Sequence, residues 1–330
     1  FWNITFASLS RNGLVKDSNQ RHPLLLSHLV ADTIYDLFIY GDNVLDDHVN
    51  LIKVKGDIRN EKLFKESVKG NDVVIHLACI SNDPSFELNP TLGKSINLDP
   101  FDPIVKISKE ENIKRFIYAS SSSVYGVKSE KNVHEDMSLE PLTDYSKFKA
   151  ICEEKLIKFK SDNFVVTTLR PATVCGYARR QRLDVIVNIL TNFAYNKNEI
   201  KIFGGSQLRP NININDMSNA YIKIIESRDD QINGEVFNVG LENYSVTKLS
   251  DIVKKIIGGN IKTTINETND NRSYHISSEK ISSILNFEFQ YSIEDAVKDL
   301  KSAFDNNHLK DPLNNEYYYN IKRMNAINLK

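Results

Sequence analysis

The chain has 330 residues, of which 41% are hydrophobic and 26% are charged, and its formal net charge is −1. This length and apolar content are enough to bury the core of one large domain or two fused lobes, and they argue against a disordered chain. The balanced charge excludes the electrostatic footprint of a nucleic-acid or anionic-membrane binder. No apolar run approaches the ~20 residues of a membrane span.

The first half of the chain alternates short β-branched or aromatic runs with helical patterns. Strands are predicted at 3–9, 33–35, 51–55, 73–77, 115–119 and 164–169. Helices are predicted between them at 60–68, 91–111 and 142–160. Apolar strands that alternate with amphipathic helices are typical of an α/β fold, so we expect a doubly wound parallel sheet covered on both faces.

The second half of the chain is less regular. Helices are predicted at 184–195, 216–226, 248–257 and 293–304, with a strand at 199–203. We therefore divide the chain into a main domain over 1–175, a smaller mixed α/β lobe over 176–310, and a polar tail over 311–330. Some segments of the second lobe are expected to return to the main sheet. The tail is expected on the surface or at an interface.

Cysteine and histidine usage argues against structural metals and disulfides. The three cysteines form no CxxC pair, and an odd count gives no disulfide framework, so a reducing cytoplasm fits best. No metal-ligand spacing is present, and we predict no metal site. The residues considered for such a site are Cys175, His76, His134 and His275.

Tyr145 and Lys149 are the first candidates for chemistry. They lie one turn apart on the predicted helix 142–160, so their side chains share a face. A tyrosine has a reference pKa near ~10, and a nearby ammonium favours its phenolate form. Such a pair can take a proton from a substrate hydroxyl as hydride leaves the same carbon. Alone, this spacing is a weak signal, because most such pairs are solvated helix faces.

A serine-rich segment strengthens the case for this pair. The stretch 116–126 ends a predicted strand and carries four consecutive serines, Ser120 to Ser123. In an open parallel sheet, ligands bind at the carboxyl ends of the strands. A serine at this edge is placed to hydrogen-bond a reacting oxygen, although a Ser-rich turn that caps a helix is the simpler interpretation.

Four further motifs accompany these residues. They are Gly-Asp-Ile-Arg at 56–59, Val-Ile-His-Leu-Ala at 74–78, Leu-Arg-Pro-Ala-Thr-Val-Cys-Gly at 169–176, and Arg-Pro-Asn-Ile-Asn-Ile-Asn-Asp at 209–216. In combination with the serines and the Tyr–Lys pair, they resemble the extended short-chain dehydrogenases/reductases, also called the NAD-dependent epimerase/dehydratase family. The resemblance runs from about Thr33 to Ala303. It implies a Rossmann-like main domain and a homodimer.

The resemblance also implies functional residues. It assigns catalysis to Ser121, which holds the reacting oxygen, to Tyr145, the proton acceptor, and to Lys149, which tunes Tyr145. It implies NAD as cofactor, bound by Asp36, Asp57, Ile58, Leu77, Ala78, Lys149 and Pro171. An acid at Asp36 accepts hydrogen bonds from a ribose hydroxyl and repels the 2′-phosphate of NADP. The implied substrate is a nucleotide diphosphate sugar, bound by Ser122, Thr173, Arg182, Asn188, Arg209 and Arg272.

The N-terminal segment departs from the family pattern. A glycine-rich turn is expected about two dozen residues before Asp36, where the chain has only Gly13, with Val15 and Ser18 at the other expected positions. Glycines there let the backbone approach a pyrophosphate. Three explanations stay open: divergence, an altered N-terminus, which we favour, or a chain that no longer binds dinucleotide well.

The residues after Ser121 bear on the reaction. Sugar 4,6-dehydratases of this family carry an Asp-Glu pair there, whereas this chain has Ser122 and Ser123, which are poor acids and bases at neutral pH. We therefore expect a nucleotide-sugar epimerase or C4 dehydrogenase that acts through a 4-keto sugar, in surface-polysaccharide precursor synthesis. A dehydratase, or a non-catalytic nucleotide-binding relative, remains the alternative.

Overall fold

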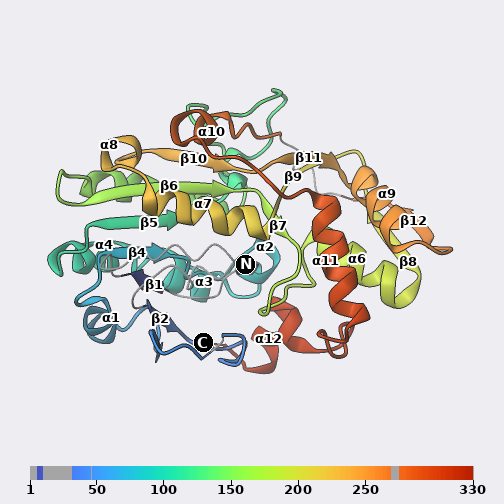
Figure 1. Ribbon diagram of the computed structural model, residues 1–330, viewed down its shortest axis with the longest axis horizontal. Helices are drawn as coiled ribbons and strands as arrows, with labels where there is room; N and C mark the ends of the chain where they lie inside the picture. The colour runs from blue at the N-terminus through green and yellow to red at the C-terminus, as the bar shows by residue number, and fades with distance from the viewer. Residues whose placement is uncertain (1–5, 10–31, 46, 269–274, 330) are drawn as a thin grey trace.

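The computed structural model describes residues 6–9, 32–45, 47–268 and 275–329. Its main sheet has the strand order β10-β6-β5-β4-β1-β2-β3 (Figure 1). The strands are β1 (Phe6–Leu9), β2 (Asp32–Asp36), β3 (Leu51–Lys55), β4 (Val73–His76), β5 (Arg115–Ala119), β6 (Val165–Pro171) and β10 (Val236–Val239). This order is that of a Rossmann-like doubly wound sheet, and it confirms the predicted fold class.

Strand β1 departs from the all-parallel expectation. It lies between β2 and β4, but it runs antiparallel to both, with Ala7 opposite Ile34 and Ile75. The pairs β2–β3, β4–β5, β5–β6 and β6–β10 are parallel. A four-residue strand can satisfy its backbone hydrogen bonds in either direction, so its apolar pattern predicts the strand and not its direction. The atypical positions Gly13, Val15 and Ser18 lie outside the described residues.

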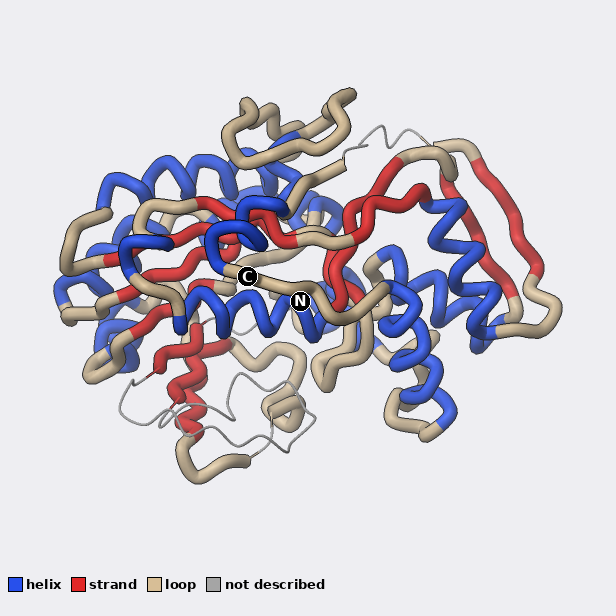
Figure 2. The backbone as a smooth tube through the Cα atoms, turned by 45° about the horizontal axis from the view of Figure 1, so that its top comes forward, coloured by secondary structure: helices blue, strands red, loops and turns tan. Residues whose placement is uncertain are grey.

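Helices cover both faces of the sheet (Figure 2). One face packs on α1 (Glu61–Val68), α3 (Pro90–Asn97), α4 (Phe101–Glu110) and α5 (Asp144–Leu156), in a core that contains Val74 and Phe116. The other face packs on α7 (Ile214–Glu226) and α10 (Glu279–Leu285), in a core that contains Ile75 and Ile117. Alternate residues of each strand thus enter opposite cores, as the pleat requires.

The helix predicted over 91–111 is two helices. Helix α3 ends at Asn97, and α4 begins at Phe101 after Pro100. Proline lacks a backbone N–H and disfavours helical backbone at the preceding residue, here Asp99. The break turns the second helix along the sheet, where Phe101, Ile104 and Val105 are fully buried.

The second lobe is smaller and mixed, as predicted, and lies beside the main sheet (Figure 1). It contains the sheet β11-β9-β7 and the pair β12-β8. Its strands are β7 (Thr173–Cys175), β8 (Glu199–Phe203), β9 (Leu208–Asn213), β11 (Glu242–Ser245) and β12 (Lys262–Asn266). Helices α6 (Ile186–Lys197), α9 (Val246–Ile257) and α11 (Ile293–Asp305) pack together around a core that includes Leu190, Leu249 and Val297.

The remaining elements are short. They are α2 (Asp83–Glu87), η2 (Ser122–Tyr125), η3 (Ile157–Phe159), α8 (Asp229–Ile232), η4 (Glu316–Tyr318) and α12 (Asn320–Ala326). The C-terminal tail, predicted on the surface or at an interface, is mostly exposed or half-buried, but Asn320 is 2% exposed and Met324 is 6% exposed. Met324 and Leu329 pack on the core of the main domain, which draws the tail inward.

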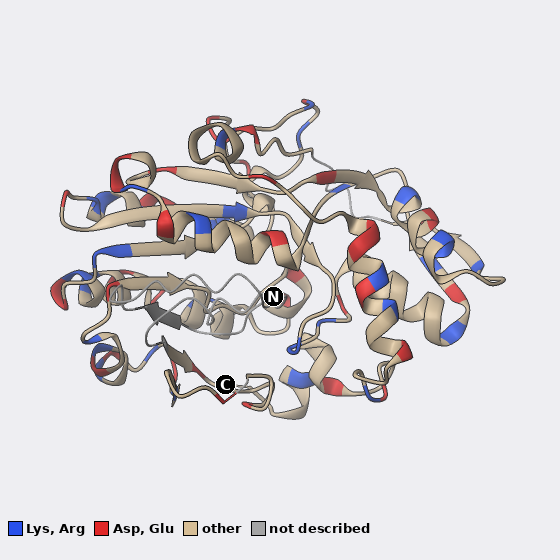
Figure 3. Cartoon of the chain, in the orientation of Figure 1, with Lys and Arg blue, Asp and Glu red and all other residues tan. Residues whose placement is uncertain are grey.

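Charged side chains are interspersed by sign over the described elements (Figure 3). Within the described part of the chain, no helix has the length and apolar character needed to cross a membrane.

Candidate active site

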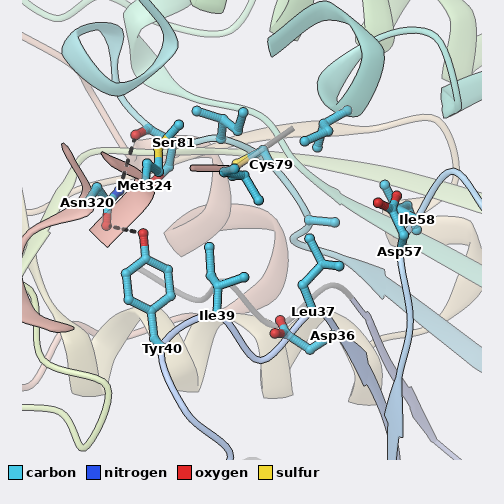
Figure 4. A pocket seen from close by; sticks show the side chains of 14 residues that line it. Asp36, Leu37, Ile39, Tyr40, Asp57, Ile58, Cys79, Ser81, Asn320 and Met324 are labelled. Carbon is cyan, nitrogen blue, oxygen red and sulfur yellow. Dashed lines mark hydrogen bonds between the residues drawn. The ribbon is translucent and has the colours of Figure 1, made fainter. Parts of the chain in front are cut away.

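Two adjoining hollows lie at the carboxyl ends of the central strands. The first, with about 550 Å³ of empty space when its open mouth is included, opens beyond β2, β3 and β4 and is closed on one side by α12 (Figure 4). The second, of about 1360 Å³ with its open mouth, lies beyond β4, β5 and β6 and is bounded by the second lobe. Cys79 and Ser81 line both hollows. Together they give an elongated cleft at the sheet edge where open α/β folds bind ligands.

Tyr145 enters the second hollow from the first turn of α5. That helix begins at the N-cap Thr143, whose hydroxyl accepts from the Ser146 backbone N–H at 3.3 Å, while the Ser146 hydroxyl accepts from the Thr143 backbone N–H. The Thr143 hydroxyl also donates to Asp83 Oδ1 at 2.5 Å. This capping box fixes the start of the helix and hence the position of the Tyr145 ring.

Ser121 follows β5 and faces the same hollow. Its hydroxyl oxygen accepts hydrogen bonds from the Ser123 backbone N–H at 3.2 Å and from the Ser123 hydroxyl at 2.9 Å. Since both bonds use the oxygen as acceptor, the Ser121 proton can be directed at a third oxygen. Ser121 is also hydrogen-bonded to Tyr145.

Lys149 lies one turn after Tyr145 and is buried. Its ammonium donates to the Ala119 carbonyl at 2.6 Å, 4.9 Å from the centroid of the Tyr118 ring and 5.8 Å from that of Tyr145. Lys149 is therefore fixed to the end of β5 beside the phenol. All three predicted catalytic residues line one hollow.

The surroundings of Tyr145 govern its acidity. Burial raises the pKa of Tyr145 well above 10, and the nearby Cys79 and Asp83 act in the same direction. Arg182 and the Ser121 hydrogen bond act to lower it. Desolvation thus outweighs the lowering effects of Arg182 and Ser121, and the net direction of the Tyr145 pKa is upward.

A buried ion pair, Arg170 with Glu153, lies next to the serine-rich segment that follows β5. Arg170 of β6 binds Glu153 of α5 through Nη2–Oε2 at 2.7 Å and Nε at 3.2 Å, and the Ser120 hydroxyl donates to the same carboxylate. Arg170 Nη1 donates to the Tyr125 hydroxyl at 2.7 Å. Although burial opposes it, pairing with Glu153 raises the pKa of Arg170. The pair ties β5, β6 and α5 together directly beneath Ser121.

The predicted cofactor residues lie in both hollows. Asp36, Asp57, Ile58 and Ala78 line the first, and Leu77, Lys149 and Pro171 line the second. Carboxylates accept hydrogen bonds from ribose hydroxyls and amino groups, and Ile58 offers an apolar wall, so these residues fit the adenosine half of a dinucleotide. Asp57 is bound by Arg59 at 2.6 and 2.9 Å, and although burial opposes it, Arg59 holds the pKa of Asp57 below its usual value.

The predicted substrate residues are brought together only in part. Ser122, Thr173, Arg182 and Arg209 line the second hollow. Asn188 does not, because its side chain is occupied with Gly176 and with the Arg182 carbonyl at 2.8 Å, which shapes the loop before α6. Arg272 lies outside the described residues.

Several lining residues were not predicted from the sequence, and three of them carry titratable side chains beside the predicted site. Cys79 follows β4, Asp83 begins α2, and Asp184 pairs with Arg182 through Oδ1–Nε at 2.8 Å. Asp184 lies between Arg182 and Asn188, which are both predicted substrate residues. The only hint in the sequence was that this acid lies two residues after an arginine.

The described residues contain no cluster of three or more His, Cys, Asp or Glu that could hold a metal.

The sheet order and the Ser–Tyr–Lys cleft define a Rossmann-like, dinucleotide-dependent class of enzyme. Residues 24–240 match the model of the NAD dependent epimerase/dehydratase family. The chain therefore belongs to that family, which confirms the predicted resemblance and NAD as the cofactor of the family.

Known relatives agree with this membership. The chain is 24% identical over 231 residues to a UDP-glucose 4-epimerase of Lactobacillus helveticus, which covers 64% of this chain and 70% of the relative. It is 25% identical to the low-salt glycan biosynthesis protein Agl12 of Haloferax volcanii, over 76% of this chain and 81% of the relative. It is also similar to the structure of a UDP-glucuronic acid 4-epimerase from Bacillus cereus in complex with UDP-glucuronic acid and NAD. That likeness has a TM-score of 0.69 and 25% identity, and covers 78% of this chain and 83% of the other.

Proposed function

We propose that the chain is an NAD-dependent nucleotide-sugar epimerase or C4 dehydrogenase that acts through a 4-keto sugar. The observation that carries this proposal is the meeting of Ser121, Tyr145 and Lys149 in one hollow that adjoins a second hollow with acceptors for an adenosine. The sugar lies over Tyr145, and its diphosphate extends toward Arg209, because a guanidinium matches phosphate geometry.

The residues divide the work as follows. Ser121 donates a hydrogen bond to the C4 oxygen of the sugar and so orients that carbon. Tyr145, as phenolate, takes the C4 hydroxyl proton while the C4–H bond breaks and the carbonyl forms. NAD, when bound, supplies the hydride acceptor. Lys149 and Arg182 stabilise the phenolate by charge. Return of hydride to the other face gives the epimer, and release of the ketone gives the dehydrogenase reaction.

Water elimination is less well supported by the cleft. The positions after Ser121 are Ser122 and Ser123, which begin η2 and carry no carboxyl group. Asp83 is a carboxylate in the lining, but its Oδ1 is engaged by the Thr143 hydroxyl at 2.5 Å. The dehydratase therefore stays the second candidate, with Asp83 as the residue on which it depends.

The biosynthetic pathway, the cellular location and the oligomeric state of the protein stay predictions within this proposal. A role in surface-polysaccharide precursor synthesis is supported by the likeness to a glycan biosynthesis protein. A cytoplasmic location agrees with three cysteines that are all free thiols. The homodimer is implied by the family.

Tyr145→Phe tests the proposal. Purified protein is incubated with NAD and with UDP-glucose or UDP-glucuronic acid, and products are resolved by NMR. The variant is expected to lose at least ~10²-fold in turnover, the usual contribution of a general base, while NAD binding is retained. Tyr291→Phe, at an exposed tyrosine, is the control. Nucleotide binding with no turnover in the parent protein would favour the non-catalytic relative instead.

A further inference from the structure

Asn320, the first residue of α12, is a buried hydrogen-bonding hub at the C-terminal end of the chain. Its Oδ1 accepts from the Tyr40 hydroxyl at 2.9 Å and from Arg180 Nη2 at 2.6 Å. Its Nδ2 donates to Ser81 Oγ at 3.2 Å, and its backbone N–H donates to Asp184 Oδ2 at 2.8 Å. Figure 4 shows the side chain between Tyr40 and Ser81.

These partners come from three separate loops of the cleft. Tyr40 follows β2, Ser81 follows β4, and Arg180 and Asp184 precede α6. A helix that merely covered the domain would bury apolar side chains, as Met324 does. Asn320 instead directs its amide and its backbone N–H at polar groups of the site, and a buried amide satisfied on both sides is geometrically demanding.

The hub forms a closed ring with Arg182. Asp184 Oδ1 accepts from Arg182 Nε at 2.8 Å, and Arg182 Nη1 donates to Ser81 Oγ at 3.3 Å. Asn320 therefore contacts both groups that hold the guanidinium. Arg182 Nη2 has no hydrogen-bond partner among the residues described. The orientation of this cation thus depends on Asp184 and Ser81, and both are fixed by Asn320.

Arg182 acts on Tyr145. The two side chains line the same hollow, and the guanidinium charge favours the phenolate. The other groups that face the phenol are Cys79 and Asp83, which oppose ionisation, Ser121, which favours it, and Lys149 on its own helix. Because the interaction between charges weakens with distance, a displaced guanidinium would stabilise the phenolate less. Burial and Asp83 would then raise the pKa of Tyr145 further.

We propose that Asn320 is a positioning residue: through Ser81 and Asp184 it holds the Arg182 guanidinium in the hollow that contains Tyr145, so the C-terminal helix sets the position of a cation at the catalytic phenol. The inference rests on the proposed function only in giving Tyr145 a catalytic role. The contacts themselves are independent of which sugar is bound.

The test titrates Tyr145 directly. Protein labelled with fluorotyrosine is followed by ¹⁹F NMR over pH, and the Tyr145 resonance is assigned by its absence from Tyr145→Phe. In Asn320→Ala, the midpoint is expected to rise by up to about one unit, the low end of the influence of a nearby opposite charge. Ser81→Ala, which removes the shared neutral acceptor, should shift it the same way, and the double variant should add little.

Two controls separate positioning from loss of structure. Leu285→Ala opens a cavity in α10, outside the ring, and should lower the thermal midpoint without moving the titration. Asn325→Ala changes an exposed asparagine of α12 and should do neither. An Asn320→Ala or Ser81→Ala protein that is folded, with the Tyr145 titration unchanged, would overturn the proposal. The titration needs no substrate, so an inactive parent protein would count against the proposed function alone.

Discussion

At the scale of single residues, the acidity of Tyr145 predicts how the reaction depends on pH. Burial raises the pKa of this phenol well above 10, and oxidation of the sugar needs the phenolate. The rate of oxidation should therefore increase with pH across the neutral and mildly alkaline range. Initial rates measured from pH 6 to pH 9.5 at saturating substrate check this. A rate that falls as pH rises would remove Tyr145 as the base.

His76 predicts an acid sensitivity of the fold. Its ring is enclosed by Phe101, Phe116 and Tyr118 with centroids 5.7 to 5.9 Å away, and burial, aided by the Lys149 charge, lowers its pKa to about 3. The unfolded chain binds this proton near pH 6.5, so the contribution to stability is present above pH 6.5 and is lost as pH falls toward 3. The full loss is on the order of 5 kcal/mol, a little over half of which falls between pH 7 and pH 4.5.

Urea unfolding at pH 7 and pH 4.5 measures this contribution. His76→Leu should show a smaller difference in the free energy of unfolding between the two pH values than the parent protein. His48→Leu, at an exposed position, should keep the difference of the parent. Equal pH dependence in His76→Leu and the parent would show that His76 is not the sensing group.

Asp36 predicts the choice of nicotinamide cofactor. It ends β2 and lines the first hollow, and in the proposed role its carboxylate would repel a 2′-phosphate. Asp36→Ser should shift the ratio of NAD to NADP affinity by about tenfold, or ~1.4 kcal/mol, toward NADP. Calorimetric titration with both cofactors measures it. Asp42→Ser, at an exposed acid of the same loop, is the control. If the NAD to NADP affinity ratio shifted in Asp42→Ser and not in Asp36→Ser, Asp42 rather than Asp36 would be the residue that contacts the ribose.

At the scale of elements, the Glu153–Arg170 pair predicts how α5 is held to the sheet. Both side chains are buried, with Nη2–Oε2 at 2.7 Å. Removing one partner leaves a buried charge unpaired, so Glu153→Ala should lower the free energy of unfolding by about 3–5 kcal/mol. Denaturant titration measures this, with the adjacent exposed Glu154→Ala as control. Losses of the same size in both variants would show that the pair has no special role.

The elements of the main domain were largely predictable from the sequence. Strands predicted at 51–55 and 115–119 have those bounds in the structure, because β-branched and aromatic runs of that length pack in few ways. The direction of β1 was not predictable, since the backbone of a short strand pairs equally in both directions. The prediction of one helix over 91–111 was wrong, because it relied on the helical spacing of apolar residues. Pro100 disfavours helical backbone at the residue before it, and the chain forms two helices.

The site was predictable where its residues follow strands in sequence. Ser121 and Tyr145 meet because β5 ends where α5 begins to cover it, an arrangement that the strand–helix alternation implies. Asn188 lies near the predicted site but has different partners, because its side-chain amide, from the first turn of α6, binds the backbone of the preceding loop at Gly176 and Arg182. Asn320 carried no sequence signal at all, because its role depends on contacts 136 to 280 residues away along the chain.

At the scale of the whole molecule, the two hollows set the geometry of the reaction. The first lies over β2 to β4, the second lies between the sheet and the second lobe, and Cys79 and Ser81 join them. A dinucleotide that occupied both hollows would have its reactive end next to the phenol of Tyr145, as the proposed function requires. The C-terminal helix α12 closes the first hollow on one side through Asn320 and Met324 (Figure 4).

The most direct test of the proposed chemistry follows the hydrogen at C4 of the sugar. UDP-glucose and UDP-glucuronic acid deuterated at C4 are incubated with the protein and NAD, and the label is traced by NMR. We predict a C4 epimer that retains deuterium at C4, or a 4-keto sugar with the deuterium on the reduced nicotinamide, and neither product with Tyr145→Phe. An inverted C4 that has lost its deuterium to solvent, a product that keeps both the deuterium and the original configuration at C4, or undiminished turnover in Tyr145→Phe would contradict it.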